Sequence, residues 1–173
     1  KSVFGGVLCN ELYAPGGHYS PRSSPYSFLS VNVKNAKNLP DALKLMVAGE
    51  QVDYKWDMED GSTKQLPTTK RQSIKVLPPH LVIHLQRFEF DYTTFQQKKV
   101  NDRFEFPHKL NMKPYTLEGR PDKVGAQNSG GDDSKSDEES HPDEYYEYEL
   151  MGIVVHSGTC NSGHYYSFIK ERD

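Results

Sequence analysis

The chain has 173 residues, of which 35% are hydrophobic and 26% charged, and its formal net charge is -3. These values are typical of one globular domain or a large piece of one, and they lack the basic excess of a nucleic-acid-binding protein. No apolar run is long enough to span a membrane. Two cysteines, Cys9 and Cys160, are too few for a disulfide framework, so we expect an intracellular protein, in the cytoplasm rather than the nucleus. Because the chain starts at Lys1 and not at a methionine, we expect it to be a piece of a longer protein.

The first half of the chain predicts two strands and one helix. Residues 27–33 alternate apolar and polar side chains, as in a strand with one buried face. Residues 39–47 have helical spacing, with Pro40 in the first turn and Gly49 just beyond the end. Residues 73–77 alternate again, and the two prolines that follow are expected to end that strand.

The second half predicts strands only. Residues 81–88 are densely apolar, which favours a central strand covered on both faces. Residues 145–150 alternate, and residues 152–156 are apolar enough to predict another central strand. A turn rich in Ser, Gly and Asn then leads into residues 165–169, so the last two strands are expected to form a hairpin. The predicted fold class is α+β, mainly antiparallel β with one short helix.

An acidic segment interrupts this pattern. Residues 119–143 are rich in Gly, Ser, Asp and Glu and contain almost no apolar side chains. Such a segment cannot bury enough surface to offset the entropy of ordering it, so we expect a disordered surface insertion. A binding role for this insertion is the alternative interpretation.

The residue with the most chemical promise is His164, which opens a predicted strand between Gly163 and Tyr165. A histidine held at the start of a strand can act as a general base, although a lone histidine is more often structural. Cys160, in the loop before it, is interpreted as a residue without catalytic duty, and a Cys–His pair within the loop is the alternative. Cys9 is interpreted as a buried or half-buried strand residue. The cysteines and histidines show no metal-ligand spacing, so we predict no metal and no cofactor.

Ordered motifs along the chain resemble those of the ubiquitin-specific proteases, a class of cysteine deubiquitinases. Two of these motifs read LPPHLVIHLQRF, at residues 77–88, and KVNDRFEFP, at residues 99–107. The segment 110–115 is similar to the very large members of the fat-facets type. The motifs span Phe4–Gly6, Leu77–Phe88, Lys99–Pro107 and His156–Ser167.

The resemblance implies a papain-like fold shaped like a hand, of which this chain supplies fingers and palm while the thumb is missing. Residues 1–173 would then be a partial catalytic domain. Residues 27–75 would form the fingers and residues 76–118 and 144–173 the palm, with 119–143 as the disordered acidic insertion.

The resemblance also implies an activity and a set of roles. The full-length protein would hydrolyse the bond after the C-terminal glycine of ubiquitin, with His164 as the general base. Phe88, His156, Gly163 and Tyr165 would line the channel for the tail of ubiquitin. The implied partners are ubiquitin and ubiquitinated proteins, with no nucleic acid and no membrane.

Two loops and one arginine complete the expected site. Residues 91–99 and 157–163 match the loops that close over the ubiquitin tail in this family. Arg87, just before Phe88, is expected to orient neighbouring loops rather than to touch substrate.

The sequence also departs from the family pattern. The nucleophilic cysteine and the third catalytic residue fall outside this chain, so we expect the chain alone to be inactive. Trp56 and Glu59 stand where the zinc-binding cysteines of the fingers usually lie, and Ser162 replaces a glycine. Two alternatives stay open: an inactive ubiquitin-binding pseudo-deubiquitinase or scaffold, and a β-rich interaction domain unrelated to ubiquitin.

Overall fold

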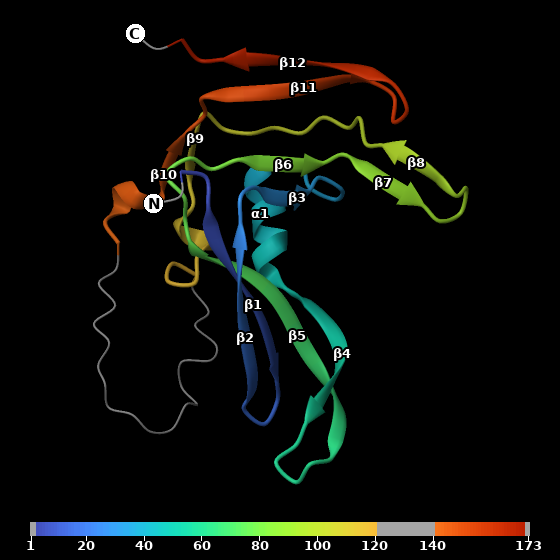
Figure 1. The fold of residues 1–173 in the computed structure, drawn as a ribbon, viewed down its shortest axis with the longest axis vertical. Coiled ribbons are helices and arrows are strands. Elements are labelled where there is room, and N and C mark those ends of the chain that lie inside the picture. Colours follow the sequence, from blue (N-terminus) through green and yellow to red (C-terminus); the bar gives the residue numbers. More distant parts are fainter. Residues whose placement is uncertain (1–2, 121–140, 172–173) are drawn as a thin grey trace.

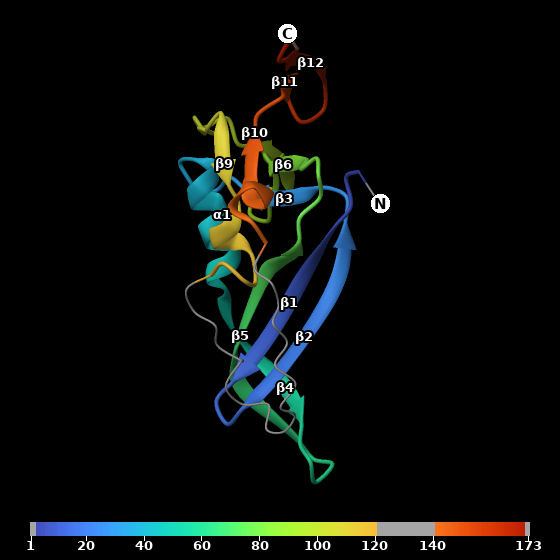
Figure 2. The same cartoon turned by 90° about the vertical axis from the view of Figure 1, so that its left-hand side faces the viewer.

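A computed structural model describes residues 3–120 and 141–171. A long arm of strands runs away from a body that contains the helix, and a separate hairpin lies across the opposite end of the body (Figure 1). The arm is narrow when seen from the side (Figure 2). The predicted fold class, α+β with mainly antiparallel strands, is confirmed.

The arm is a four-stranded antiparallel sheet in the order β2-β1-β5-β4. Strand β5 enters the body at its C-terminal end, where Ile74 is fully buried. The arm is therefore continuous with the body through β5, which includes residues 73–76 of the strand predicted at residues 73–77. Its strands are β1 (Gly6–Ala14), β2 (His18–Tyr26), β4 (Glu50–Asp57) and β5 (Thr63–Val76).

The helix α1 (Leu39–Ala48) begins and ends as its sequence predicts. The Asn38 side chain accepts a hydrogen bond from the backbone N–H of Asp41 at 2.8 Å and donates one to its carboxylate, also at 2.8 Å. Pro40 lies in the first turn, where a missing N–H leaves no hydrogen bond unmade. The helix predicted over residues 39–47 is confirmed.

Beside the helix, β3 (Leu29–Asn32) and β6 (Ile83–Gln86) form a parallel two-stranded sheet. The half-buried strand predicted at residues 27–33 is confirmed by β3. The prediction that residues 81–88 form a central strand covered on both faces is wrong for the described structure. Strand β6 pairs there with β3 alone, and its side chains alternate between half-buried and exposed, because polar His84 and Gln86 alternate with the apolar residues.

Short strands and two hairpins complete the body. The hairpin predicted from residues 152–156 and 165–169 is confirmed, but within the described ranges its first strand pairs only with its second and is not central. The strand predicted at residues 145–150 starts later, because the chain first makes a 3₁₀ turn. These elements are β7 (Phe88–Asp91), β8 (Gln96–Lys99), β9 (Lys109–Asn111), η1 (Lys113–Tyr115), η2 (Asp143–Tyr146), β10 (Glu147–Glu149), β11 (Gly152–Gly158) and β12 (Gly163–Ile169).

The hydrophobic core lies between α1, the β3–β6 sheet and the end of β5. Fully buried Leu43 comes from the helix, Leu29 from β3, and Ile74 from β5. The aromatic ring of Tyr146 closes the core from η2. No helix in the described ranges is long and apolar enough to cross a membrane.

A buried ion cluster joins the arm to residue 120. The carboxylate of Glu11 accepts hydrogen bonds from Arg71 Nε at 3.3 Å and Arg120 Nη2 at 2.9 Å, and from the Tyr19 hydroxyl at 2.8 Å. Arg120 also donates to Ser73 Oγ at 2.8 Å. Arg120 is therefore part of the ordered structure, although residues 119–143 were expected to form a disordered insertion; most of that segment lies outside the described residues.

The rings of His18, Tyr54 and Trp56 pack together in the arm. Trp56 is at a position where the family resemblance implied a zinc-binding cysteine. Trp56 is buried and donates a hydrogen bond from Nε1 to Thr68 Oγ1 at 2.8 Å. Its ring centroid lies 5.4 Å from those of both His18 and Tyr54. The contact between Trp56 and His18 links β4 to the start of β2 by apolar packing across the sheet.

We predict that Glu11→Gln destabilises the protein at pH 7 by about 3–5 kcal/mol, because it leaves two buried guanidinium groups without their counter-charge. Burial opposes the charge of Glu11, yet the hydrogen bonds and charges of Arg120 and its neighbours hold the pKa of this carboxyl below its usual value. The stabilisation is therefore complete above the unfolded-state pKa of about 4.3 and is lost as the pH falls through the lower folded-state value.

Urea denaturation at pH 7 and in steps below pH 4 would measure this. The matched control is Glu50→Gln, because Glu50 is exposed and forms an ion pair with exposed Lys70 at 3.3 Å, so its loss should change the free energy of unfolding by less than about 1 kcal/mol. Equal effects of the two substitutions at pH 7 would contradict the prediction.

Candidate active site

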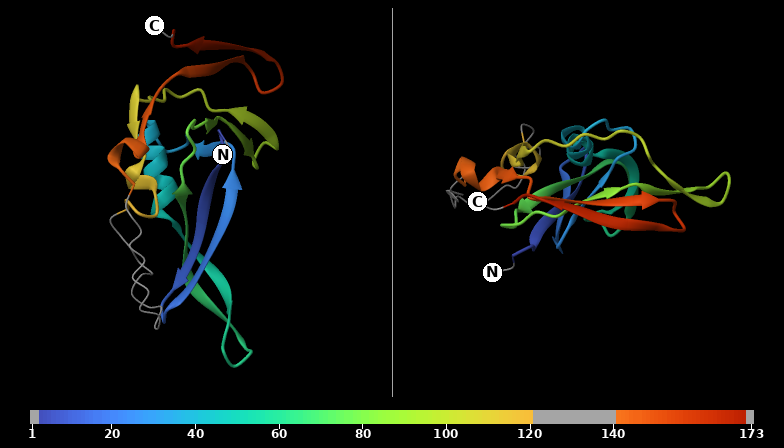
Figure 3. Two further views of the ribbon diagram at one scale, coloured as in Figure 1. Left: turned by 60° about the vertical axis from the view of Figure 1, so that its left-hand side comes forward. Right: turned by 90° about the horizontal axis from the view of Figure 1, so that it is seen from above.

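The hairpin β11–β12 carries most of the residues singled out from the sequence. Its register pairs His156 with Tyr165, Ser157 with His164 and Gly158 with Gly163. The turn is closed by a hydrogen bond from Thr159 N to Ser162 O at 2.8 Å. Seen from above, the hairpin runs along β7–β8 (Figure 3). The loop expected at residues 157–163 is thus the tight end of a regular antiparallel ribbon.

Two glycines allow the ribbon to close. Gly158 has a φ of 128°, a conformation that side chains rarely allow. At Gly163, an added Cβ would lie 2.3 Å from Ser157 O and 2.4 Å from His156 Nε2. The imidazole of His156 therefore occupies the space that a side chain at position 163 would fill.

An aromatic cluster forms between the two hairpins. The His156 ring centroid lies 5.5 Å from that of Phe88, on β7, and 4.8 Å from that of Tyr165, on β12. Within the described chain, Nδ1 of His156 is buried without a hydrogen-bond partner. The structure thus brings Phe88 together with His156, Gly163 and Tyr165 of the β11–β12 hairpin, although it lies far from them in the sequence.

His164 lies on the other face of the ribbon. Successive side chains of a strand point to opposite faces, so His164 points away from the cluster of His156 and Tyr165. Its side chain is exposed, and no hydrogen bond joins it to any other described residue. The imidazole is therefore free to meet a group that approaches from outside the described chain.

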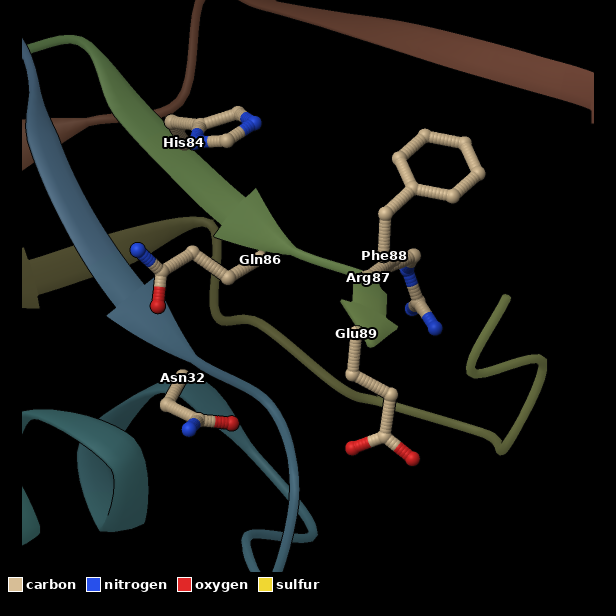
Figure 4. Close-up of a pocket in the computed structure, with 6 residues that line it drawn as sticks. All are labelled: Asn32, His84, Gln86, Arg87, Phe88 and Glu89. Carbon is tan, nitrogen blue, oxygen red and sulfur yellow. The ribbon is translucent and has the colours of Figure 1, made fainter. Parts of the chain in front are cut away.

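A pocket of about 330 Å³ opens beside Phe88 (Figure 4). Phe88 points to one side of this pocket and Glu89 to the other, as their alternation along β7 requires. The remaining walls are mostly polar. They come from Asn32, His84, Gln86 and Arg87.

Arg87 orients the chain around the pocket. Its Nη1 donates to Val100 O at 3.0 Å and to Asp102 O at 3.1 Å, while Val100 N donates to Arg87 O at 2.7 Å. These bonds fix the end of β8, so the interpretation of Arg87 as a residue that orients a neighbouring segment agrees with the described contacts.

Lys99 makes two hydrogen bonds that the sequence did not predict. Its Nζ donates to His156 O at 3.0 Å and to Gly158 O at 3.1 Å, across the gap between the two hairpins. The only signal in the sequence was its place at the start of the KVNDRFEFP motif, which gives no hint of these partners.

The two cysteines lie in different surroundings. Cys9 is buried in β1, as expected, and burial raises the pKa of its thiol, with a further contribution from Glu11. Cys160 lies in the turn of the β11–β12 hairpin and is partly buried. Figure 1 shows β1 in the arm, at the other end of the body from β12, so Cys9 does not approach His164.

Comparisons with known proteins identify the family. The model of the family described as ubiquitin carboxyl-terminal hydrolase matches residues 2–173. The chain belongs to the ubiquitin carboxyl-terminal hydrolase family. It is 39% identical to the probable ubiquitin carboxyl-terminal hydrolase FAF of Drosophila melanogaster over 170 residues, which are 96% of this chain and 6% of that protein. It is 35% identical to human ubiquitin carboxyl-terminal hydrolase 24, covering 99% of this chain and 7% of that protein. The resemblance to ubiquitin-specific proteases, including the fat-facets type, is confirmed.

Solved structures agree with this assignment of the family. The chain superimposes on the SAGA Ubp8/Sgf11/Sus1/Sgf73 DUB module bound to ubiquitin aldehyde with a TM-score of 0.75 and 30% sequence identity. The match covers 98% of this chain and 34% of that chain. The chain thus spans a small part of its curated relatives and about a third of this solved one. In the described residues, no group of three or more His, Cys, Asp or Glu is arranged to hold a metal ion.

We predict that Gly163→Ala opens the end of the ribbon, because its Cβ would displace both the Ser157 carbonyl and the His156 ring. Backbone amides near the turn should exchange with solvent faster, and the tyrosine and histidine signals of the cluster should shift in an NMR spectrum. Gly152→Ala is the matched control on the same hairpin, where the nearest atom to an added Cβ is Phe168 O at 3.3 Å. Unchanged exchange at residues 156–164 in Gly163→Ala would count against the close contact.

Proposed function

We propose that the protein containing this chain is a ubiquitin-specific thiol protease that hydrolyses the bond after the C-terminal glycine of ubiquitin. One observation carries the proposal: in a chain of this family, the strand that contributes Tyr165 to the aromatic cluster between two hairpins carries an exposed histidine at the preceding position, on its other face. The solved relative that carries ubiquitin aldehyde supports the choice of ubiquitin as substrate.

In the proposed reaction, His164 accepts the proton of a cysteine thiol. The resulting thiolate attacks the carbonyl carbon of the terminal glycine of ubiquitin, and the protonated imidazole gives its proton to the departing amine. A water molecule, deprotonated by His164, then hydrolyses the thioester and regenerates the thiol. His164 suits both proton transfers because its ring is exposed and no hydrogen bond joins it to another described residue.

The thiol is proposed to come from outside this chain. Cys9 is buried in the arm, and its raised pKa disfavours the thiolate that attacks a carbonyl. Cys160 lies in the hairpin turn, and no hydrogen bond pairs it with His164 in the described structure. The residue that orients the imidazole is likewise proposed to lie outside the chain, because His164 has no hydrogen-bond partner within the described residues.

The tail of ubiquitin is proposed to pass the aromatic cluster and to end at the edge of β12 that no described strand covers, where it can reach His164. One wall of this path is made of aromatic rings, from Phe88, His156 and Tyr165. Because Gly163 has no side chain, the backbone of β12 lies close to the His156 ring. Tyr165 is 69% exposed, so part of this wall is open to a ligand. We propose that this wall is one side of a channel narrow enough to admit only glycine, which excludes tails with larger residues because they would clash.

The arm is proposed to be the fingers that hold the globular body of ubiquitin. It is built from residues 6–26 and 50–76, whereas the fingers were expected at residues 27–75. The proposed fingers thus include β1 and β2 and leave out β3 and α1, which belong to the core of the body.

The proposal is tested with the complete protein and ubiquitin that carries an electrophilic C-terminus. We expect a covalent adduct with the unvaried protein, and we expect His164→Ala to lower kcat/KM for ubiquitin-tail hydrolysis by about a hundredfold or more. His108→Ala is the matched control, because that side chain is exposed outside the two hairpins and the substitution keeps the backbone carbonyl that accepts from Leu150 N. Binding of ubiquitin without an adduct would favour the pseudo-deubiquitinase, and no binding at all would refute both.

A second prediction concerns residues 1–173 alone. We expect no hydrolysis of a ubiquitin C-terminal substrate by this chain, because neither of its cysteines is placed to act with His164. A fluorogenic ubiquitin substrate measures the rate, with the complete protein as the positive control. Hydrolysis that disappears in Cys160→Ala would refute the prediction and make Cys160 the nucleophile.

A further inference from the structure

The ammonium group of Lys99 joins the two hairpins that border the candidate site. It binds the carbonyls of His156 and Gly158, at 3.0 and 3.1 Å, and these two residues flank Ser157. Hydrogen bonds from a charged donor are stronger than those between neutral groups. Lys99 therefore holds a short stretch of β11 at two points.

The ribbon has few other attachments. Among the described residues, the hydrogen bonds that reach β11 or β12 from another element are the two from Lys99. The Phe88–His156 ring contact is the apolar counterpart on the same hairpin pair. Along β12 every side chain is exposed, so burial contributes little to holding this strand.

Lys99 is itself held firmly. It pairs with Phe88 in the register of β7–β8, and the next residue, Val100, is bonded to Arg87 through both its N–H and its carbonyl. Its side chain is partly buried, in contrast to the exposed Lys98 beside it. The side chain thus extends from a fixed base and is held at its far end by two carbonyls of β11.

The stretch held by Lys99 lies directly opposite His164. Ser157, between the two bonded carbonyls, pairs with His164, and Gly158 pairs with Gly163. At Gly163 the two strands are already in tight contact through Ser157 O. Any displacement of residues 156–158 must therefore carry His164 with it.

We propose that Lys99 is a positioning residue that fixes the backbone opposite His164 and couples the β7–β8 hairpin to the turn of β11–β12. This inference rests on the proposed function for its effect on catalysis, but its structural part does not. A residue that acts by positioning the base lowers kcat and leaves KM nearly unchanged, whereas a lysine that binds the ubiquitin tail directly would raise KM.

The test uses the complete protein with Lys99→Met, Lys99→Arg and the matched control Lys98→Met. Methionine keeps the length and apolar stem of lysine but removes the donors, and arginine keeps a charged donor. We expect amides at residues 156–164 to exchange about tenfold faster in Lys99→Met, the factor that corresponds to one charge-assisted hydrogen bond. The kcat should fall by a similar factor at constant KM, with partial recovery in Lys99→Arg. Lys98→Met is the control for hydrogen exchange and should leave the exchange at residues 156–164 unchanged.

The proposed function and the structural role of Lys99 can be refuted independently. An unvaried protein without activity would refute the proposed function, and hydrogen exchange would still decide the role of Lys99. Unchanged exchange in Lys99→Met, or exchange raised equally by Lys98→Met, would overturn the coupling of the hairpins. Activity with a raised KM and unchanged kcat would overturn positioning in favour of direct contact with substrate.

Discussion

The geometry of the candidate site depends on how a two-stranded ribbon is held against the rest of the molecule. An isolated hairpin is at best marginally stable in water, and the β11–β12 hairpin pairs with no third strand in the described structure. Its side chains do not form a core of their own, because Val154 and Phe168 are mostly exposed. Contacts at its turn end, from Phe88 and Lys99, and at its base, where Leu150 N bonds His108 O at 2.8 Å, therefore set where the histidines lie.

The body, unlike the ribbon, is stabilised by a buried core and a buried ion cluster. There the apolar face of α1, the β3–β6 sheet and the end of β5 exclude water, and Glu11 anchors two arginines at the base of the arm. The described ends on either side of residues 121–140 also meet, since Glu118 accepts hydrogen bonds from Tyr146 and lies 3.1 Å from His141 Nδ1.

Local signals in the sequence were enough where one residue type determines one conformation. Asn38, Pro40 and Gly49 define the ends of α1, and the Ser, Gly and Asn turn defines the last hairpin. That Phe88 lies near His156 was predicted only from the resemblance to a family, because no periodicity relates these two residues. Strand β2 was missed because it contains Pro21 and Pro25 and few apolar residues, which an edge strand tolerates but a pattern search rejects.

What the sequence could not predict is mostly a matter of long-range contacts. A dense apolar run such as residues 81–88 indicates burial but does not say how many strands will cover it. The same holds for Lys99, whose partners are backbone carbonyls, and carbonyls are present at every position of the chain. Arg120 falls within a polar segment, so only the position of Glu11 on β1 reveals that its charge is buried.

The register of the ribbon is the last link between these contacts and the chemistry. A slip by one residue would move His164 to the face of Phe88 and turn Tyr165 away from it, because side chains alternate along a strand. Where one face of a strand is buried, burial prevents such a slip, but β12 is exposed on both faces. The register must then be set by features of the ribbon itself: the φ of Gly158, the close approach at Gly163, and the two carbonyls bound by Lys99. These three features lie within two pairs of His164 along the ladder, so the position of the histidine follows from the backbone around it rather than from a core beneath it.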